Sequence, residues 1–236
     1  MNKFYRLKIV LLVAVLLVFK QNVSIAQTEP THWANDGYQY FVAQGGEIVE
    51  LDTRDDSKKT IIVSNKMLTP EGKATIGVKR FAFSADNKKV LINTNTKRVW
   101  RYDTRGDYWV YDLSTKTLTQ IGKDRPASSL MFAKLSPDGT KAAYVSEHNV
   151  YVETLGSSAV KQVTTDGTKK LINGTFDWVY EEEFDCRDGF RWSPDSKAIA
   201  YWQIDASKIK VGGAGGWPWV FAGDGRDYDE PGPAAV

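Results

Sequence analysis

Short segments in which apolar and polar residues alternate run along most of the chain. Two of them, DYWVYDLSTKTLTQI (residues 107–121) and HNVYVETLGSSAVKQV (residues 148–163), each contain a small polar break in the middle. Strict alternation is typical of half-buried β-strands, and Ser-Thr-Lys or Gly-Ser-Ser breaks are typical of short turns. Each segment therefore predicts a pair of antiparallel strands.

A second pattern is a phrase that occurs three times. FAFSADNKKVLI (81–92) is echoed by AKLSPDGTKAAYV (133–145) and FRWSPDSKAIAYW (190–202). Pro137 and Pro194 preset the backbone for a turn in the second and third phrases, and the aspartate of each phrase, Asp86, Asp138 or Asp195, can accept hydrogen bonds from nearby amides. Each phrase predicts a hairpin whose turn begins at Ser84, Ser136 or Ser193.

These strand pairs and hairpins together predict a repeat of four strands. Four strands in roughly 40 to 50 residues are typical of a β-propeller blade. By this period the span from Gln27 to Lys210 holds about four blades. A β-sandwich with coincidental turns is the alternative interpretation.

The first residues predict export. Lys3, Arg6 and Lys8 precede an apolar run from Ile9 to Phe19, which is shorter than the roughly 20 residues of a membrane-spanning helix. The Ser-Ile-Ala sequence before Gln27 suits signal-peptide cleavage after Ala26. The mature protein is expected to be periplasmic or extracellular, and an uncleaved membrane anchor is the alternative.

Charge and cysteine content exclude some functions. Removing the four basic leader residues, Lys3, Arg6, Lys8 and Lys20, changes the formal net charge from +2 to about −2, so no basic face for nucleic acid is expected. Cys186 is the only cysteine, which excludes an intrachain disulfide and a cysteine-based zinc site. The acidic run from Asp224 to Glu230 lacks the spacing of a calcium loop. We predict no metal and no cofactor.

The segment DWVYEEEF (177–184) places three adjacent glutamates, Glu181, Glu182 and Glu183, among aromatic residues. Adjacent carboxylates raise each other's pKa unless a cation relieves them. A solvated acidic turn is one interpretation of such a run. The flanking Trp178, Tyr180 and Phe184 favour an anchored segment instead.

DWVYEEEF, with NGTFDWVYEEEF (173–184), RDGFRWSPDSKAIAYWQID (187–205) and WRYDTRGDYWVYDL (100–113) in the same order, resembles the propeller of the dipeptidyl peptidase IV family of serine exopeptidases. The resemblance runs from about residue 35 to Lys210. In that family a propeller covers an α/β-hydrolase domain, and the enzyme removes Xaa-Pro or Xaa-Ala dipeptides from peptide N-termini. Family activity is linked to dimers, but the dimerising surfaces lie largely outside this segment, so a family dimer is possible here and the resemblance does not predict the oligomeric state.

The resemblance implies specific roles for several residues. Glu182 and Glu183 would bind the α-ammonium group of the substrate, and Arg101 would donate hydrogen bonds to the carbonyl of the substrate's second residue from the cleavage point. Glu181, Trp178 and Tyr180 would support the site structurally. A role of Arg101 as a simple salt-bridge partner remains the alternative. The expected partners are peptide N-termini.

The catalytic residues of such an enzyme are not found in this sequence. No G-x-S-x-G motif occurs, and the two histidines, His32 and His148, precede every position where a catalytic histidine would be expected. After Lys210 the sequence becomes rich in glycine and proline, which predicts a frameshift or assembly junction; a genuine flexible tail is the alternative. We therefore expect no catalytic residue here and no activity of the chain alone.

The expected fold class is all-β, a partial β-propeller of about four blades with a short helical insertion that bears the glutamates. The expected domains are a signal peptide at residues 1–26, the partial propeller at 27–210 and an aberrant tail at 211–236. The expected function is that of the N-terminal part of an exported dipeptidyl peptidase. A noncatalytic peptide-binding or structural propeller module is the alternative.

Overall fold

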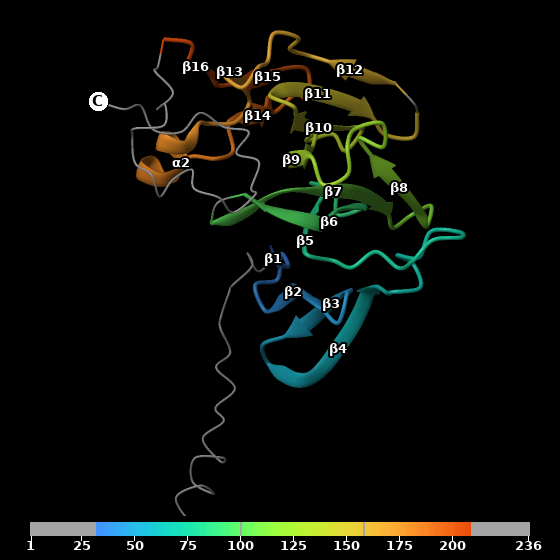
Figure 1. The fold of residues 1–236 in the computed structure, drawn as a ribbon. Coiled ribbons are helices and arrows are strands. Elements are labelled where there is room, and N and C mark those ends of the chain that lie inside the picture. The colour runs from blue at the N-terminus through green and yellow to red at the C-terminus, as the bar shows by residue number, and fades with distance from the viewer. Residues whose placement is uncertain (1–31, 100, 158, 209–236) are drawn as a thin grey trace, which may run out of the picture. The chain divides into compact units, whose positions relative to one another are not determined.

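The structure, a computed structural model, describes residues 32–99, 101–157 and 159–208. These residues form antiparallel strands and one short helix, α2, at Trp178–Phe184 (Figure 1). The predicted all-β class is confirmed. The predicted signal peptide and tail lie outside the described residues, and the domain boundaries stay predictions. No helix in the described part of the chain is long and apolar enough to cross a membrane.

Blade 1 is a four-stranded sheet in which each strand pairs with the next one along the chain. Its strands are β1 (His32–Trp33), β2 (Gln39–Gln44), β3 (Glu47–Asp52) and β4 (Asp55–Val63). The register between β2 and β3 is regular from the Gln39–Asp52 pair to the Gln44–Glu47 pair. The Gly45-Gly46 turn that joins them needs positive φ angles, which glycine adopts without strain.

Blade 2 contains the first repeated phrase and the first alternating segment. Its strands are β5 (Arg80–Phe83), β6 (Lys89–Val99), β7 (Tyr102–Asp112) and β8 (Thr117–Ile121). The phrase forms the β5–β6 hairpin, and residues 107–121 form the pairing of β7 with β8. The alternation and the turn residues predict both hairpins, and both predictions are confirmed.

Blade 3 repeats this arrangement. Its strands are β9 (Leu130–Leu135), β10 (Lys141–Ser146), β11 (Asn149–Thr154) and β12 (Val160–Gln162). The second phrase forms the β9–β10 hairpin, and residues 148–163 contain the pairing of β11 with β12. Glu147 and His148 form the two-residue turn between β10 and β11, and both have positive φ.

Blade 4 carries the helix. Its strands are β13 (Leu171–Asn173), β14 (Phe190–Trp192), β15 (Ile199–Tyr201) and β16 (Gln203–Asp205). The third phrase forms the β14–β15 hairpin, and β13 pairs with β16. Helix α2 is inserted between β13 and β14, so this blade presents the glutamate segment.

The three repeated phrases form the same turn. In each, the serine hydroxyl donates to the aspartate two residues later at 2.6 Å and accepts an amide N–H five residues later at 2.9 Å. The serine hydroxyl bond is the main cause that lowers the pKa of Asp86 and of Asp195, and it lowers that of Asp138 to about 2. The turn of blade 3 also contacts that of blade 4, because Asp138 N–H donates to Ser196 Oγ at 3.0 Å.

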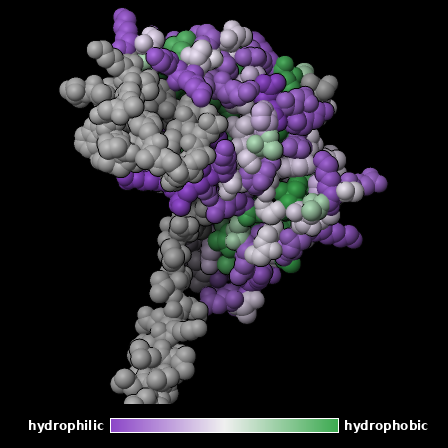
Figure 2. Space-filling view, viewed as in Figure 1, coloured by the Kyte–Doolittle hydropathy of each residue, from purple (hydrophilic) through white to green (hydrophobic). Residues whose placement is uncertain are grey.

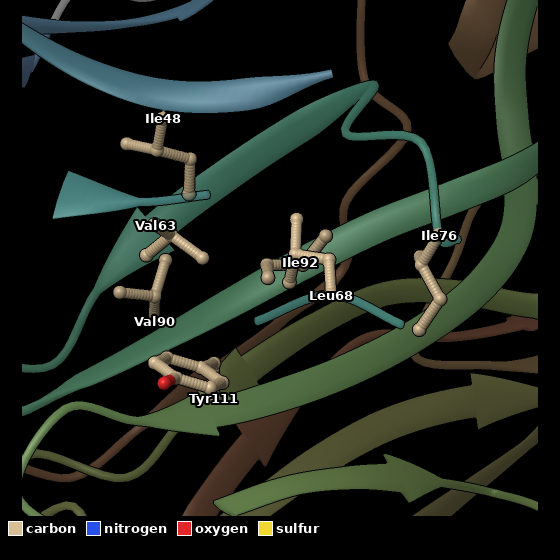
Figure 3. Close-up of a cluster of buried hydrophobic side chains, with 7 residues drawn as sticks. All are labelled: Ile48, Val63, Leu68, Ile76, Val90, Ile92 and Tyr111. Atoms are coloured by element: carbon tan, nitrogen blue, oxygen red, sulfur yellow. The ribbon is translucent and has the colours of Figure 1, made fainter. Parts of the chain in front are cut away.

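The hydrophobic core consists of clusters that join consecutive blades. Figure 3 shows the cluster between blades 1 and 2, where residues of β3 and β4 meet β6, β7 and the connecting segment: Ile48, Val63, Leu68, Ile76, Val90, Ile92 and Tyr111. A second cluster joins blades 2 and 3, and a third joins blades 3 and 4 through Phe190. Hydrophilic residues predominate on the face drawn in Figure 2, where hydrophobic ones lie in small groups.

Blades 2 and 3 are also joined by backbone pairing. The β6–β7 hairpin continues past the body of blade 2, and its β7 strand pairs with β9 at Arg105–Met131 and Gly106–Leu130. Register shifts in β6 after Thr94 and after Lys97 change the course of the extended part. The hairpin extension carries Arg101 and Tyr102 at its far end.

Candidate functional site

The candidate site is centred on α2. Asp177 precedes the helix in an extended conformation, and its Oδ1 accepts the N–H of Tyr180 at 3.0 Å. This is an N-cap, which satisfies one of the backbone donors that the first helical turn leaves free. At the other end Asp185 adopts a left-handed conformation, and the N–H of Cys186 donates to the carbonyl of Tyr180. Both ends of this two-turn helix are therefore fixed locally.

Aromatic contacts hold the helix against blade 4. The rings of Phe176 and Tyr180 lie 5.4 Å apart, and those of Tyr180 and Phe184 lie 5.6 Å apart. Phe176 is buried, and its ring also lies 6.0 Å from that of Trp202, between β15 and β16. Tilted aromatic pairs at these distances are favourable. Tyr180, predicted as structural support, thus lies in the aromatic contact between helix and sheet.

The first glutamate of the run points into the protein. Glu181 is buried, and its Oε1 accepts Arg187 Nε at 3.2 Å. Burial is the main cause that raises the pKa of Glu181, and Glu182 and Asp185 act in the same direction, whereas Arg187 lowers it. Arg187 balances part of the cost of placing this carboxylate in the interior.

The second glutamate connects the helix to blade 2. Glu182 Oε2 lies 3.0 Å from Arg101 Nη2; the carboxylate side chain is 8% exposed and the arginine side chain 74% exposed. The other carboxylate oxygen, Oε1, is buried and has no hydrogen-bond partner among the described residues. A buried carboxylate oxygen without a donor is unfavourable. The site thus contains an acceptor that a bound donor could satisfy.

The third glutamate, Glu183, is exposed and makes no ion pair with any residue that the structure describes. The structure therefore brings Arg101 and Glu182 into contact, whereas Glu183 follows Glu182 on the helix with its side chain exposed to solvent. Trp178 is the first residue of α2, and its side chain lies outside what the structure describes. These positions provide the geometry of the predicted site, whereas the roles of the residues stay predictions.

Sequence reasoning missed two residues near the site, Arg187 and Tyr102. The guanidinium of Arg187 lies 3.6 Å from the centroid of the Tyr102 ring. Tyr102 directly follows Arg101 in the sequence. Charge balance could have indicated Arg187, because it is the only basic residue between Lys170 and Arg191, a stretch with six acidic residues. The stacking of Arg187 on Tyr102 depends on the length of the β6–β7 hairpin. The polar residues of that hairpin do not indicate its length.

The histidines lie elsewhere. His32 Nε2 is within hydrogen-bond distance of the Phe81 carbonyl at 3.0 Å, and its ring lies 5.2 Å from that of Phe81. His148 is in the turn between β10 and β11. Within the described ranges, no group of three or more histidine, cysteine, aspartate or glutamate residues is placed to hold a metal ion.

Comparison with known proteins places the site within a family region. Residues 84–212, which include every site residue named above, match the family model described as "Dipeptidyl peptidase IV (DPP IV) N-terminal region". The chain is 33% identical over 178 residues to dipeptidyl aminopeptidase B of Saccharomyces cerevisiae, covering 75% of this chain and 21% of the yeast protein. It is 40% identical over 127 residues to a probable dipeptidyl-aminopeptidase B of Trichophyton verrucosum, covering 53% and 14% respectively.

A solved structure has a similar fold. The crystal structure of Porphyromonas gingivalis dipeptidyl peptidase 4 aligns with a TM-score of 0.67 at 23% sequence identity, covering 78% of this chain and 26% of that one. The chain thus spans between about a seventh and about a fifth of the length of the curated relatives cited here, and about a quarter of the solved one.

Proposed function

Because the chain belongs to the dipeptidyl peptidase IV family and matches its N-terminal region, we propose that it recognises the free N-terminus of peptide substrates. Glu182 and Glu183 bind the α-ammonium group, and Arg101 binds a carbonyl oxygen of the peptide. The whole-protein reaction that this recognition serves is the release of N-terminal dipeptides, with Xaa-Pro or Xaa-Ala sequences as the substrate class. Export through the leader at residues 1–26 is part of the proposal.

The observation that carries the proposal is the buried, unpartnered Oε1 of Glu182. An ammonium group has three N–H donors and a positive charge, so it can satisfy this oxygen and still reach a neighbouring carboxylate. Hydrogen bonds between ionised partners are shorter and stronger than neutral ones. An acetylated N-terminus is neutral and has one donor, which makes it a poor substitute.

Arg101 supports the proposal through its exposure. One Nη contacts Glu182, while most of the side chain is open to solvent. A guanidinium has five donors in a planar arrangement, so one edge can hold Glu182 while another donates to a peptide carbonyl. In the proposed site, the group that binds the carbonyl is therefore next to the group that binds the amine, and the spacing between them would select the end of a peptide.

The test is calorimetric binding to the full chain. We expect a hexapeptide that begins Ala-Pro to bind at least about tenfold more tightly than its N-acetylated form, because acetylation removes a charged hydrogen-bond donor. Glu182→Gln and Glu183→Gln should each weaken binding of the free-amine peptide by about ten- to a hundredfold, by the same reasoning.

Glu71→Gln is the matched control, because Glu71 is exposed and lies in the segment between β4 and β5. This variant should bind both peptides as the wild type does. Equal affinity of the wild type for the two peptides, or unchanged binding by both Glu182→Gln and Glu183→Gln, would refute the proposed function.

A further inference from the structure

Arg187 is mostly buried near the site and makes several hydrogen bonds, unlike a solvent-exposed surface arginine. Its Nε donates to Glu181 Oε1 at 3.2 Å, its Nη1 to Asp185 Oδ1 at 2.5 Å and its Nη2 to the Glu181 carbonyl at 3.4 Å. Its guanidinium lies on the Tyr102 ring, and the side chain is only 17% exposed. All three nitrogens and one face of the group are therefore engaged.

These contacts join two elements that are distant in the sequence. Tyr102 begins β7 at the end of the long hairpin of blade 2, whereas Glu181 and Asp185 belong to α2 and its C-terminal cap in blade 4. Tyr102 and Glu181 are each adjacent to a residue of the candidate site, because Arg101 precedes Tyr102 and Glu182 follows Glu181. Arg187 thus contacts the sequence neighbours of both members of the Arg101–Glu182 ion pair.

We propose that Arg187 is a positioning residue for amine recognition: it joins the Tyr102 end of the β6–β7 hairpin to helix α2, and so holds Arg101 and Glu182 at the distance that a peptide N-terminus requires. The proposal rests on the proposed function of this site. Arg187 itself does not touch the peptide.

An arginine suits this task better than a lysine. A planar guanidinium can stack on an aromatic ring while its edge donates hydrogen bonds to carboxylates, and both uses are favourable together. Lysine would keep the positive charge near Glu181 but would lose the fork of donors and the flat contact with Tyr102. The Lys and Gln variants therefore separate the effect of charge from that of geometry.

Arg187 also affects the ionisation of Glu181. Glu181 is faced by Arg187, Glu182 and Asp185, and Glu182 is in turn paired with Arg101. Arg187 lowers the pKa of Glu181, so its removal should raise the pH at which this glutamate becomes ionised. A simple loss of packing would not by itself produce this shift.

The experiment compares Arg187→Gln, Arg187→Lys and Tyr102→Leu with the wild type. We expect Arg187→Gln to weaken binding of the free-amine Ala-Pro hexapeptide at least about tenfold, since both the orientation and the charge support are lost. Arg187→Lys should bind with intermediate affinity. Tyr102→Leu should also weaken binding, because it removes the ring and leaves the Glu181 pair in place.

Carbon-13 NMR titration of the glutamate carboxylates supplies a readout that needs no peptide. Arg187→Gln should move the Glu181 midpoint to higher pH, whereas Arg187→Lys should restore a midpoint near that of the wild type. Arg191→Gln is the control, because Arg191 is also paired with an aspartate, Asp188, but is exposed. It should leave both binding and the Glu181 midpoint unchanged.

The outcomes separate the two proposals. A wild type that binds the free-amine and acetylated peptides equally refutes the proposed function, and with it the role of Arg187 in recognition. A wild type that prefers the free amine, together with wild-type binding by Arg187→Gln, overturns the positioning role alone. If circular dichroism shows that Arg187→Gln does not fold, the other two variants decide. The positioning role is then overturned if both Arg187→Lys and Tyr102→Leu bind the free-amine peptide with wild-type affinity.

Discussion

At the scale of single residues, the close approach of β6 to β7 depends on Gly106. A Cβ atom at this position would lie 2.5 Å from Asn93 Nδ2 and 2.9 Å from the Thr94 carbonyl oxygen. Real Cβ atoms do not approach backbone oxygens so closely, so a side chain here would push the two strands apart. The same glycine pairs with Leu130 of β9, which makes it a shared point of blades 2 and 3.

We therefore predict that Gly106→Ala destabilises the protein. Overpacking of a closely packed position costs about 1 to 3 kcal/mol, and urea unfolding would measure this loss. Gly77→Ala is the matched control, since a Cβ there meets nothing within 4 Å. It should change the free energy of unfolding by no more than about 0.5 kcal/mol. Equal stability of the two variants would contradict the argument.

The residues of the candidate site differ in how far the sequence could indicate them. Glu182, Glu183 and Arg101 belong to short local motifs, so the resemblance of these motifs to a known family is enough to predict them from the sequence alone. Charge balance in the sequence could have indicated Arg187, because it is the only basic residue among six acidic ones between Lys170 and Arg191, and the structure adds that it pairs with the buried Glu181. Tyr102 could not be found, because its contact depends on two distant elements meeting in space.

At the scale of elements, α2 is short and depends on its ends. Two turns give few internal hydrogen bonds, and helices of this length are not stable alone in water. The N-cap by Asp177 and the aromatic contacts of Tyr180 therefore decide whether the glutamates have fixed positions. Asp177 is itself buried, so its carboxylate is held in place by the protein around it.

Asp177→Ala should lower the free energy of unfolding by about 0.5 to 2 kcal/mol, the usual cost of removing an N-cap. Asp177→Asn should retain most of the stability, because the amide oxygen can accept the Tyr180 N–H in the same way. Chemical denaturation of the two variants and the wild type provides the measurement. An alanine variant as stable as the asparagine variant would show that the cap does not stabilise the helix.

The hairpins are the elements that the sequence predicts best. The three Ser-x-Asp phrases predict β5–β6, β9–β10 and β14–β15, because a turn residue at a fixed place between two apolar segments determines a hairpin locally. The extension of the β6–β7 hairpin is not predicted. Its sequence, NTNTKRVWRYDTRGD, is mostly polar and alternates weakly, so nothing local distinguishes a long hairpin from a loop.

At the scale of the whole molecule, consecutive blades are connected by specific contacts as well as by apolar clusters. Lys134 of β9 forms an ion pair with Asp188, which precedes β14, and its Nζ lies 3.8 Å from the centroid of the Phe190 ring. Burial is the main cause that lowers the pKa of Lys134 to about 8, with Asp188 opposing it and Arg191 acting with it. Burial in the folded state thus disfavours the charged form of Lys134 in this contact.

This pKa predicts how stability changes with pH. Between about pH 8 and 10.5 the unfolded chain keeps the Lys134 proton and the folded chain loses it, so the contribution of Lys134 to stability rises with pH. The free energy of unfolding of the wild type should therefore rise by about 1 to 3 kcal/mol over this window relative to that of Lys134→Met, which has no group that ionises at this position.

Urea unfolding at several pH values from 7 to 10.5 would measure this difference. Lys161→Met is the control, because Lys161 lies exposed on β12, and its difference from the wild type should stay constant. A Lys134→Met difference that is equally constant would contradict the pKa argument.

The pairing of strands from different blades could not be predicted from the sequence, for a physical reason. Alternation predicts which residues of a strand face the core, but it does not say which strand lies beside it. The β7–β9 pairing involves only two residue pairs, Arg105–Met131 and Gly106–Leu130. Such a short ladder leaves no periodic signal, although it fixes the hairpin that carries Arg101.

The ion pair between Arg101 and Glu182 has a consequence for the order in which the protein is made. Arg101 is synthesised early, and the whole of blade 3 follows before Glu182 appears. Contacts between residues so distant in the chain form more readily once the intervening segment is ordered, because closing a long flexible loop costs entropy. The nascent chain would therefore form its second and third blades before the Arg101–Glu182 ion pair can exist. The candidate site would be completed only when α2 has been synthesised.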